Sequence, residues 1–119
     1  MSKIGMVILN YNDYETTFDM INQIKDYKVL NHIIIVDNHS TDLKYDKLKK
    51  LKSNNIDVIQ TDENKGYAYG NNYGIKYLND NYDVDYIIIS NPDILVNEKC
   101  IINLNLSFFY NFCYVFEGC

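Results

Sequence analysis

Proline and glycine are scarce in this sequence: 119 residues include one proline and five glycines. Together with 47% hydrophobic and 23% charged residues, this scarcity excludes the disordered and low-complexity classes and indicates a soluble globular domain. A chain of this length builds one core and is too short for two ordinary domains. We therefore expect residues 1–119 to form a single domain.

Cysteines are few as well. Cys100, Cys113 and Cys119 are odd in number, lack the CxxC spacing and all lie at or beyond position 100. This pattern argues against a disulfide framework or a zinc site. We expect reduced thiols, as in a cytosolic protein.

Basic residues are outnumbered, with 11 lysines and arginines against 16 aspartates and glutamates and a net charge of -5. An acidic surface does not attract nucleic acid or anionic membranes, so neither is expected as a partner. A ligand that carries phosphate would need local help from backbone N–H groups, a lysine or a metal ion.

Long hydrophobic runs are missing too. The N-terminal MSKIGMVILNYND has a short apolar run without a small-residue cleavage site, which predicts a first strand and not a signal peptide. The apolar stretch 100–116 is interrupted by Asn103, Asn105 and Asn111, and it lacks the roughly 20 apolar residues of a membrane helix. We expect no stable membrane span, a cytoplasmic location and at most peripheral contact with the inner face of the membrane.

Four short apolar runs are present instead: IGMVIL (4–9), HIIIVD (32–37), IDVIQT (56–61) and YIIIS (86–90). They are rich in β-branched residues and do not alternate with polar ones, which is typical of parallel strands covered on both faces. Each is followed by a helical pattern, so right-handed βαβ units are expected. The predicted fold class is α/β, with a mostly parallel sheet under helices.

The predicted helices follow the first three strands. The first begins near Asn12, where Glu15 would complete a capping box, the second follows NHSTD (38–42), and the third runs from about 65 to 79. After position 95 a helix is slightly favoured over a strand, because Asn97 and Glu98 could cap one. The apolar side chains that mark these helices are Tyr14, Phe18, Ile21 and Ile24 in the first, Leu43, Leu48 and Leu51 in the second, and Ala68, Ile75 and Leu78 in the third.

Residues rich in Asn and Asp follow every apolar run, at 10–13, 37–42, 61–72 and 91–93. Helix caps and turns explain each stretch taken alone. Taken together, they place Asp37, Asp42, Asp62 and Asp93 at one edge of the sheet, where the carboxylates would repel one another unless a cation or a ring of donors used them. Ligands of open parallel sheets bind at this edge, so the convergence favours a binding site.

The loops also exclude two kinds of nucleotide site. The first loop, NYND, lacks the glycines of a dinucleotide fold, and there is no GxxxxGK[ST] phosphate loop. In the third loop, Gly66, Gly70 and Gly74 recur every four residues, and each glycine inside a helix costs about 1 kcal/mol relative to alanine. They would permit close approach either of a neighbouring element or of a ligand.

The segment NPD (91–93) ends the fourth strand. Pro92 has no N–H for a sheet and restricts Asn91 to an extended conformation, so it fixes where Asp93 points. A carboxylate there suits Mg²⁺ or Mn²⁺, which take one or two carboxylates plus substrate phosphates. The alternative is a turn in which an Asx cap starts the next helix.

The segments VILNYN, IIIVDNHSTD, NKGYAYGNNYG and NPDIL, in this order, resemble the inverting family 2 glycosyltransferases with a GT-A fold, especially the rhamnosyltransferase-like branch. The resemblance covers about residues 4–96. It implies a three-layer α/β/α fold, a nucleotide-diphosphate-sugar donor (UDP- or dTDP-linked), Mg²⁺ or Mn²⁺, and a glycan acceptor. The family suggests bacterial cell-surface polysaccharide synthesis.

The resemblance also implies which residues bind the donor. Asp93 would be the metal ligand at the end of a DxD-type signature, in which Asn91 replaces the usual first carboxylate. Asp37 would accept a hydrogen bond from the base or ribose. The implied donor-binding residues are Leu9, Asn10 and Tyr11 at the nucleoside, Asp37, then Asn64, Gly66 and Asn72 in the glycine-rich motif, and Asn91 and Asp93.

Residues 97–119 do not match the family's later region, so the chain is expected to be truncated after the DxD-type motif, and the catalytic base is not identified. An alternative function is a non-catalytic nucleotide-binding module. A flavodoxin-like signalling domain is disfavoured, because no lysine-bearing strand follows. We also expect self-association, since a half-length sheet would leave apolar surface and a strand edge uncovered.

Overall fold

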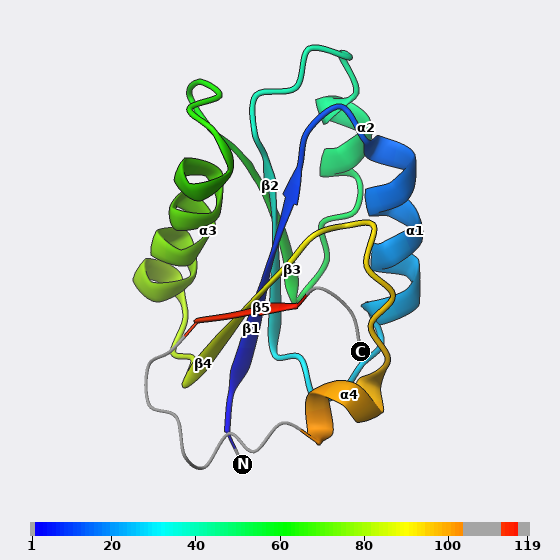
Figure 1. Cartoon of the computed structure of the whole chain (residues 1–119), viewed down its shortest axis with the longest axis vertical. Helices are drawn as coiled ribbons and strands as arrows, with labels where there is room; N and C mark the ends of the chain where they lie inside the picture. The colour runs from blue at the N-terminus through cyan, green and yellow to red at the C-terminus, as the bar shows by residue number, and fades with distance from the viewer. Residues whose placement is uncertain (1, 104–112, 117–119) are drawn as a thin grey trace.

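The computed structural model describes residues 2–103 and the backbone of residues 113–116 (Figure 1). Within these residues, five parallel strands form one sheet in the order β3-β2-β1-β4-β5. No helix of this described part is long and apolar enough to cross a membrane. The elements in chain order are β1 Ile4–Asn10, α1 Tyr14–Ile24, β2 His32–Asp37, α2 Tyr45–Lys49, β3 Ile56–Gln60, α3 Tyr67–Asn81, β4 Tyr86–Ser90, α4 Glu98–Ile102 and β5 Cys113–Phe116.

Helices cover both faces of the sheet, with α1, α2 and α4 on one face and α3 on the other (Figure 1). The central strand β1 shows why its apolar residues do not alternate with polar ones. Val7, paired in register with Ile34 and Ile89, belongs to the core under α3, whereas Ile8 belongs to the core under α1. Both side chains are fully buried. The predicted three-layer α/β/α architecture is therefore confirmed.

The start of α1 differs from the prediction. Its N-cap residue is Asp13, whose side chain accepts no capping hydrogen bond. Glu15, expected to complete a capping box, lies 3.2 Å from the Nζ of Lys44 through its Oε1. Asn12 has a φ of 49° and so lacks the extended backbone of an N-cap residue.

Three apolar side chains from the predicted helical patterns are exposed. Phe18 and Ala68 are exposed, and Leu43 is almost fully exposed at a φ of 61°. In α1, Met20 is buried where Phe18 is not. The buried positions of α3 are Gly70, Asn71, Gly74 and Leu78. The apolar pattern predicted where the helices lie in the sequence. Which side of each helix is buried depends on how the helix packs against the sheet.

Two glycines bring α3 into contact with the sheet. A Cβ atom on Gly74 would lie 2.6 Å from Cγ1 of Val7, and one on Gly70 would lie 2.5 Å from Cδ1 of Leu9. Of the two roles considered for these glycines, the structure supports close approach of a neighbouring element. Gly66 differs, because it has a φ of 101° at the N-cap of α3 and no atom within 4 Å of its Cβ position. It is needed for its backbone conformation.

The predicted helix after position 97 is confirmed as α4. Asn97 caps it by accepting a hydrogen bond at Oδ1 from the backbone N–H of Cys100, at 2.8 Å. The expectation of reduced thiols is wrong at Cys100, which is disulfide-bonded. An odd number of cysteines leaves one residue over but does not prevent a single bridge. The side chains of Cys113 and Cys119 lie outside the described residues.

Candidate functional site

Asn12 ties together the loops that follow β1 and β2. Its Oδ1 accepts hydrogen bonds from the backbone N–H groups of Thr41 at 2.8 Å and Asp42 at 3.1 Å. Its Nδ2 donates to Oγ1 of Thr41 at 3.0 Å. Asparagine tolerates the positive φ that this position requires. The two loops are thus fixed to each other at the carboxyl end of the sheet.

Asp37 is the centre of a buried hydrogen-bond network at the same end. Its Oδ1 accepts from Nδ2 of Asn10 at 2.9 Å and Oγ of Ser40 at 2.6 Å. Its Oδ2 accepts from the backbone N–H of Ser40 at 3.0 Å and Nε2 of Gln60 at 2.9 Å. Asn10 in turn accepts from Oγ1 of Thr17 at 2.7 Å. Since a carboxylate has about four acceptor sites, Asp37 uses all of them to join the ends of three strands.

The other strand-end aspartates also have local donors. Asp42 accepts from the backbone N–H of Lys44 at 3.1 Å. Oδ1 of Asp62 accepts from the hydroxyl of Tyr69 at 2.6 Å, which lowers the pKa of Asp62. No cluster of three or more His, Cys, Asp or Glu suited to a metal ion occurs among the described residues. Asp42 and Asp62 thus each accept a hydrogen bond from a local donor, whereas Asp93 lines a cavity.

The glycine-rich loop is held by a second buried amide. Nδ2 of Asn38 donates to Oδ1 of Asn64 and to the carbonyl oxygen of Gly66, each at 3.2 Å, and its Oδ1 accepts from Oγ1 of Thr61 at 3.1 Å. Asn64 also accepts from the backbone N–H of Gly66 at 2.9 Å. These contacts shape the turn into α3, whereas Asn72 is exposed on that helix.

A cavity of about 270 Å³ lies beyond the ends of β1 and β4, and we name it the strand-end pocket. Four residues that the resemblance assigned to the donor meet in it: Leu9, Tyr11, Asn91 and Asp93. The other assigned residues, Asn10, Asp37, Asn64, Gly66 and Asn72, do not line it. The complete lining is Leu9, Tyr11, Asp13, Tyr67, Asn91, Pro92 and Asp93.

The lining has an aromatic and an oxygen-bearing part. Tyr11 is 46% and Tyr67 48% exposed, so both rings present faces on which a ligand could stack. Asp13, Asn91 and Asp93 supply carboxylate and amide oxygens. The pocket therefore joins surfaces for a planar ring and for a cation or hydroxyl groups.

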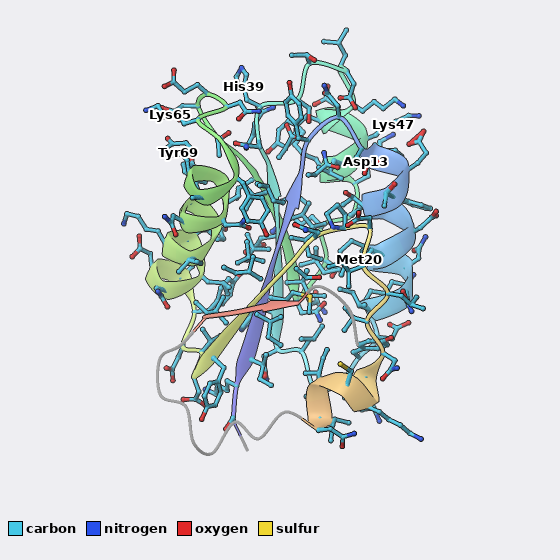
Figure 2. All side chains as sticks on the ribbon, in the orientation of Figure 1. Asp13, Met20, His39, Lys47, Lys65 and Tyr69 are labelled. Atoms are coloured by element: carbon cyan, nitrogen blue, oxygen red, sulfur yellow. The ribbon has the colours of Figure 1, made fainter. Side chains whose placement is uncertain are left out.

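Two of these lining residues were missed by the sequence analysis. Asp13 stands in NYND (10–13), one of the four strand-end stretches, but was not named among the candidate residues; its Oδ1 accepts from Oγ1 of Thr16 at 2.7 Å. Figure 2 shows Asp13 at the end of the sheet where β1 terminates. Tyr67 directly follows Gly66, and an aromatic residue beside a glycine in the third strand-end stretch was the available signal.

A second cavity of about 210 Å³ adjoins the pocket and shares Pro92 and Asp93 with it. Thr16, Asp19 and Gln23 of α1 also line it. A larger cavity of about 530 Å³ lies between the end of α1 and the start of β3, at the opposite end of the sheet, and does not belong to the site.

A parallel sheet with a pocket beyond its carboxyl ends defines a ligand-binding α/β domain. The sequence model described as Glycosyl transferase family 2 matches residues 6–106. The chain therefore belongs to glycosyl transferase family 2, and its fold is the α/β GT-A fold of that family.

The chain is also similar to a characterised glycosyltransferase, at low sequence identity. The chain is 28% identical over 100 residues to the low-salt glycan biosynthesis hexosyltransferase Agl10 of Haloferax volcanii. This match covers 83% of the chain but 30% of the relative, so the chain spans less than a third of the length of that protein.

Proposed function

We propose that the chain binds a nucleotide-diphosphate sugar, UDP- or dTDP-linked, as the donor-binding part of a glycosyltransferase in glycan synthesis. The position of the strand-end pocket carries this proposal. The chain adds β2 and β3 on one side of β1 and then β4 on the other side, so the order of the strands reverses between β1 and β4. The pocket lies beyond the ends of these two strands. In open α/β sheets, ligands bind at this reversal point. Membership of family 2 supports a nucleotide sugar as the ligand.

The two parts of the pocket suit two parts of such a donor. Leu9 and Tyr11 would contact the nucleoside, because apolar and aromatic surfaces pack well against a base. Asn91 and Asp93 would lie beside the diphosphate. Pro92 stands between them and restricts the backbone, so it would hold both oxygen-bearing side chains at the strand end.

The oxygen-bearing part fits Mg²⁺ or Mn²⁺. Asp13, Asn91 and Asp93 line the same cavity, and these ions bind one or two carboxylates together with substrate phosphates. We propose Asp93 as the metal ligand and Asp13 as a second carboxylate. When bound, the cation would neutralise charge on the departing diphosphate.

The proposed reaction is a single displacement. An acceptor hydroxyl oxygen bonds to the anomeric carbon, the bond from that carbon to the diphosphate oxygen breaks, and the hydroxyl proton passes to a base, which we do not assign. The adjoining cavity carries the hydroxyl, carboxylate and amide groups of Thr16, Asp19 and Gln23. These groups suit sugar hydroxyls, and we propose this cavity for the acceptor glycan.

Calorimetric titration tests the proposal. The folded protein is titrated with UDP- and dTDP-linked hexoses, including a rhamnose donor because the motifs resemble the rhamnosyltransferase-like branch, with and without Mn²⁺. We expect the protein to bind a nucleotide sugar and Mn²⁺ to strengthen this binding. Absence of binding to every nucleotide sugar would contradict the proposed function. A transfer and hydrolysis assay with the same donors follows. Binding without either reaction would instead support a non-catalytic nucleotide-binding module.

A further inference from the structure

Asn71 on α3 has a buried side chain without a hydrogen-bond partner. It is 3% exposed, and neither its Nδ2 nor its Oδ1 is bonded within the described structure. The buried amides of Asn10 and Asn38, by contrast, are bonded. Burying an amide with both polar atoms unpaired is unfavourable. A partner from outside the chain would remove this penalty.

The unpaired amide lies next to the strand-end pocket. Asn71 is one helical turn after Tyr67, and helical side chains lean towards the N-terminus of their helix. The side chain of Asn71 therefore extends towards Tyr67, which lines the pocket. The preceding Gly70 packs against Leu9, a second lining residue. Asn71 is thus one helical turn from a residue that lines the pocket and directly follows a residue that packs against Leu9.

A ligand in the pocket would reach the amide after a change of rotamer at Tyr67 or Leu9. Tyr67 is 48% exposed and Leu9 is partly buried, so a change of rotamer in either residue would open a path from the pocket to the amide. The cavity volume of about 270 Å³ lies just below the roughly 300–1,000 Å³ of pockets for drug-sized ligands. The pocket would therefore enclose only part of a nucleotide sugar, and the part beside Tyr67 and Leu9 would take the planar base.

We propose that Asn71 recognises the nucleobase of the donor by hydrogen bonds to its edge, while Tyr67 stacks on its face. This inference rests on the proposed function. The amide presents one donor and one acceptor side by side, and the imide edge of uracil or thymine presents an N–H beside a carbonyl. The ligand class is therefore a uridine or thymidine diphosphate, recognised through the N3–H edge of its base.

The experiment compares UDP, dTDP and N3-methyl-UDP in calorimetric titrations of the whole chain, because the methyl group removes the donor of the imide edge. Wild-type protein should bind N3-methyl-UDP at least tenfold more weakly than UDP. Asn71→Leu should bind UDP about tenfold more weakly and lose the discrimination against the methylated base. Its thermal midpoint should stay equal or rise, because leucine removes two unpaired polar atoms.

Matched controls lie on the same helix. Tyr67→Ala should weaken UDP binding, whereas Tyr73→Ala and Asn79→Leu, at exposed positions outside the pocket lining, should leave it unchanged. If Asn71→Leu does not fold, Asn71→Ala replaces it, and the wild-type comparison of UDP with N3-methyl-UDP needs no variant.

The outcomes separate this inference from the proposed function. Equal binding of UDP and N3-methyl-UDP by the wild type, or unchanged UDP binding by Asn71→Leu, would overturn the role of Asn71 alone. If Asn71→Leu weakens binding of a UDP-sugar but not of UDP, the amide contacts the sugar and not the base. This result would also overturn the proposed role of Asn71. Failure of the wild type to bind any nucleotide would overturn both.

Discussion

At the scale of single residues, buried polar side chains join the strand ends beneath the candidate site by hydrogen bonds. Other residues line the pocket. Asp37 accepts four hydrogen bonds, from Asn10, Gln60 and both the backbone and side chain of Ser40. Asp93 is exposed in the pocket. Asp37 ends one predicted strand and Asp93 follows another, but only their surroundings distinguish a structural carboxylate from one available to a ligand.

Asp37→Asn should destabilise the fold by about 3 kcal/mol, because one carboxylate oxygen becomes an NH₂ group that faces donors instead of accepting from them. Urea unfolding followed by circular dichroism measures this free energy. Asp46→Asn is the control, since the Asp46 side chain is 90% exposed and should change stability by less than about 0.5 kcal/mol. Equal effects of the two variants would contradict the structural role of Asp37.

Asp93→Ala should abolish the strengthening of nucleotide-sugar binding by Mn²⁺, since it removes the proposed ligand. A loss of about tenfold in affinity is expected with Mn²⁺ present and little change without it. Asp83→Ala, whose side chain is 91% exposed and outside the pocket, should keep the response to Mn²⁺. If Asp93→Ala also keeps that response, the metal is bound elsewhere.

At the scale of elements, the position of α3 against the sheet decides which residues can reach the pocket. Gly74→Ala should destabilise the protein by about 2 kcal/mol, because the added Cβ would lie 2.6 Å from Val7 and 2.7 Å from Val36, and overpacking exceeds the gain in helix propensity. Asn79→Ala, at an exposed position of α3, should be neutral or slightly stabilising. Chemical denaturation of both variants checks this, and a stabilising Gly74→Ala would show that α3 can move outward freely.

The far end of α3 is held to β3 by Asp57. Its Oδ1 accepts from Nζ of Lys52 at 2.7 Å, and its Oδ2 accepts from the hydroxyls of Tyr77, at 3.1 Å, and Tyr82. Burial raises the pKa of Asp57, but the hydrogen bonds from Lys52, Tyr82 and Tyr77 outweigh burial and lower it overall. The hydrogen bond to Asp57 raises the pKa of Tyr82 to about 12. The tyrosines are therefore protonated donors over the neutral range.

His32 makes this end of the molecule sensitive to acid. Its ring stacks on Tyr82 with 3.8 Å between the centroids. Burial lowers its pKa below 6.5; the charge of Asp57 opposes this effect, and that of Lys3 adds to it. The unfolded chain then binds the proton more readily, so stability should fall as the pH drops from about 6.5 towards the folded-state pKa.

His32→Phe tests this, since it keeps a stacked ring and removes the titrating group. Thermal unfolding at several pH values between 7 and 5 should show a smaller loss of stability in the variant than in the wild type. Identical pH dependence of the two proteins would contradict the role of His32.

At the scale of the whole molecule, the sequence predicted four of the strands, their parallel direction and helices on the sheet, because unalternating apolar runs admit few arrangements. It predicted neither β5 nor the order of the strands in the sheet. It also located four residues of the pocket. It missed Asp13, and it missed Tyr67 because the side of α3 that faces the sheet depends on how closely Gly70 and Gly74 let the helix approach. Phe18 was misassigned for a similar reason, since only packing fixed the rotation of α1.

The expected self-association can be argued from surface residues. Leu95 and Ile102 are 73% and 60% exposed near α4, and β3 is an edge strand, features that favour contact with another copy. Light scattering during size-exclusion chromatography should give a mass above the 14.0 kDa of one chain, rising with concentration.

Leu95→Gln combined with Ile102→Gln should shift the mass towards 14.0 kDa, while Leu43→Gln, exposed in the loop before α2, should not. A wild-type mass of one chain at every concentration would contradict the association, and an effect of Leu43→Gln alone would move the contact to the strand-end loops.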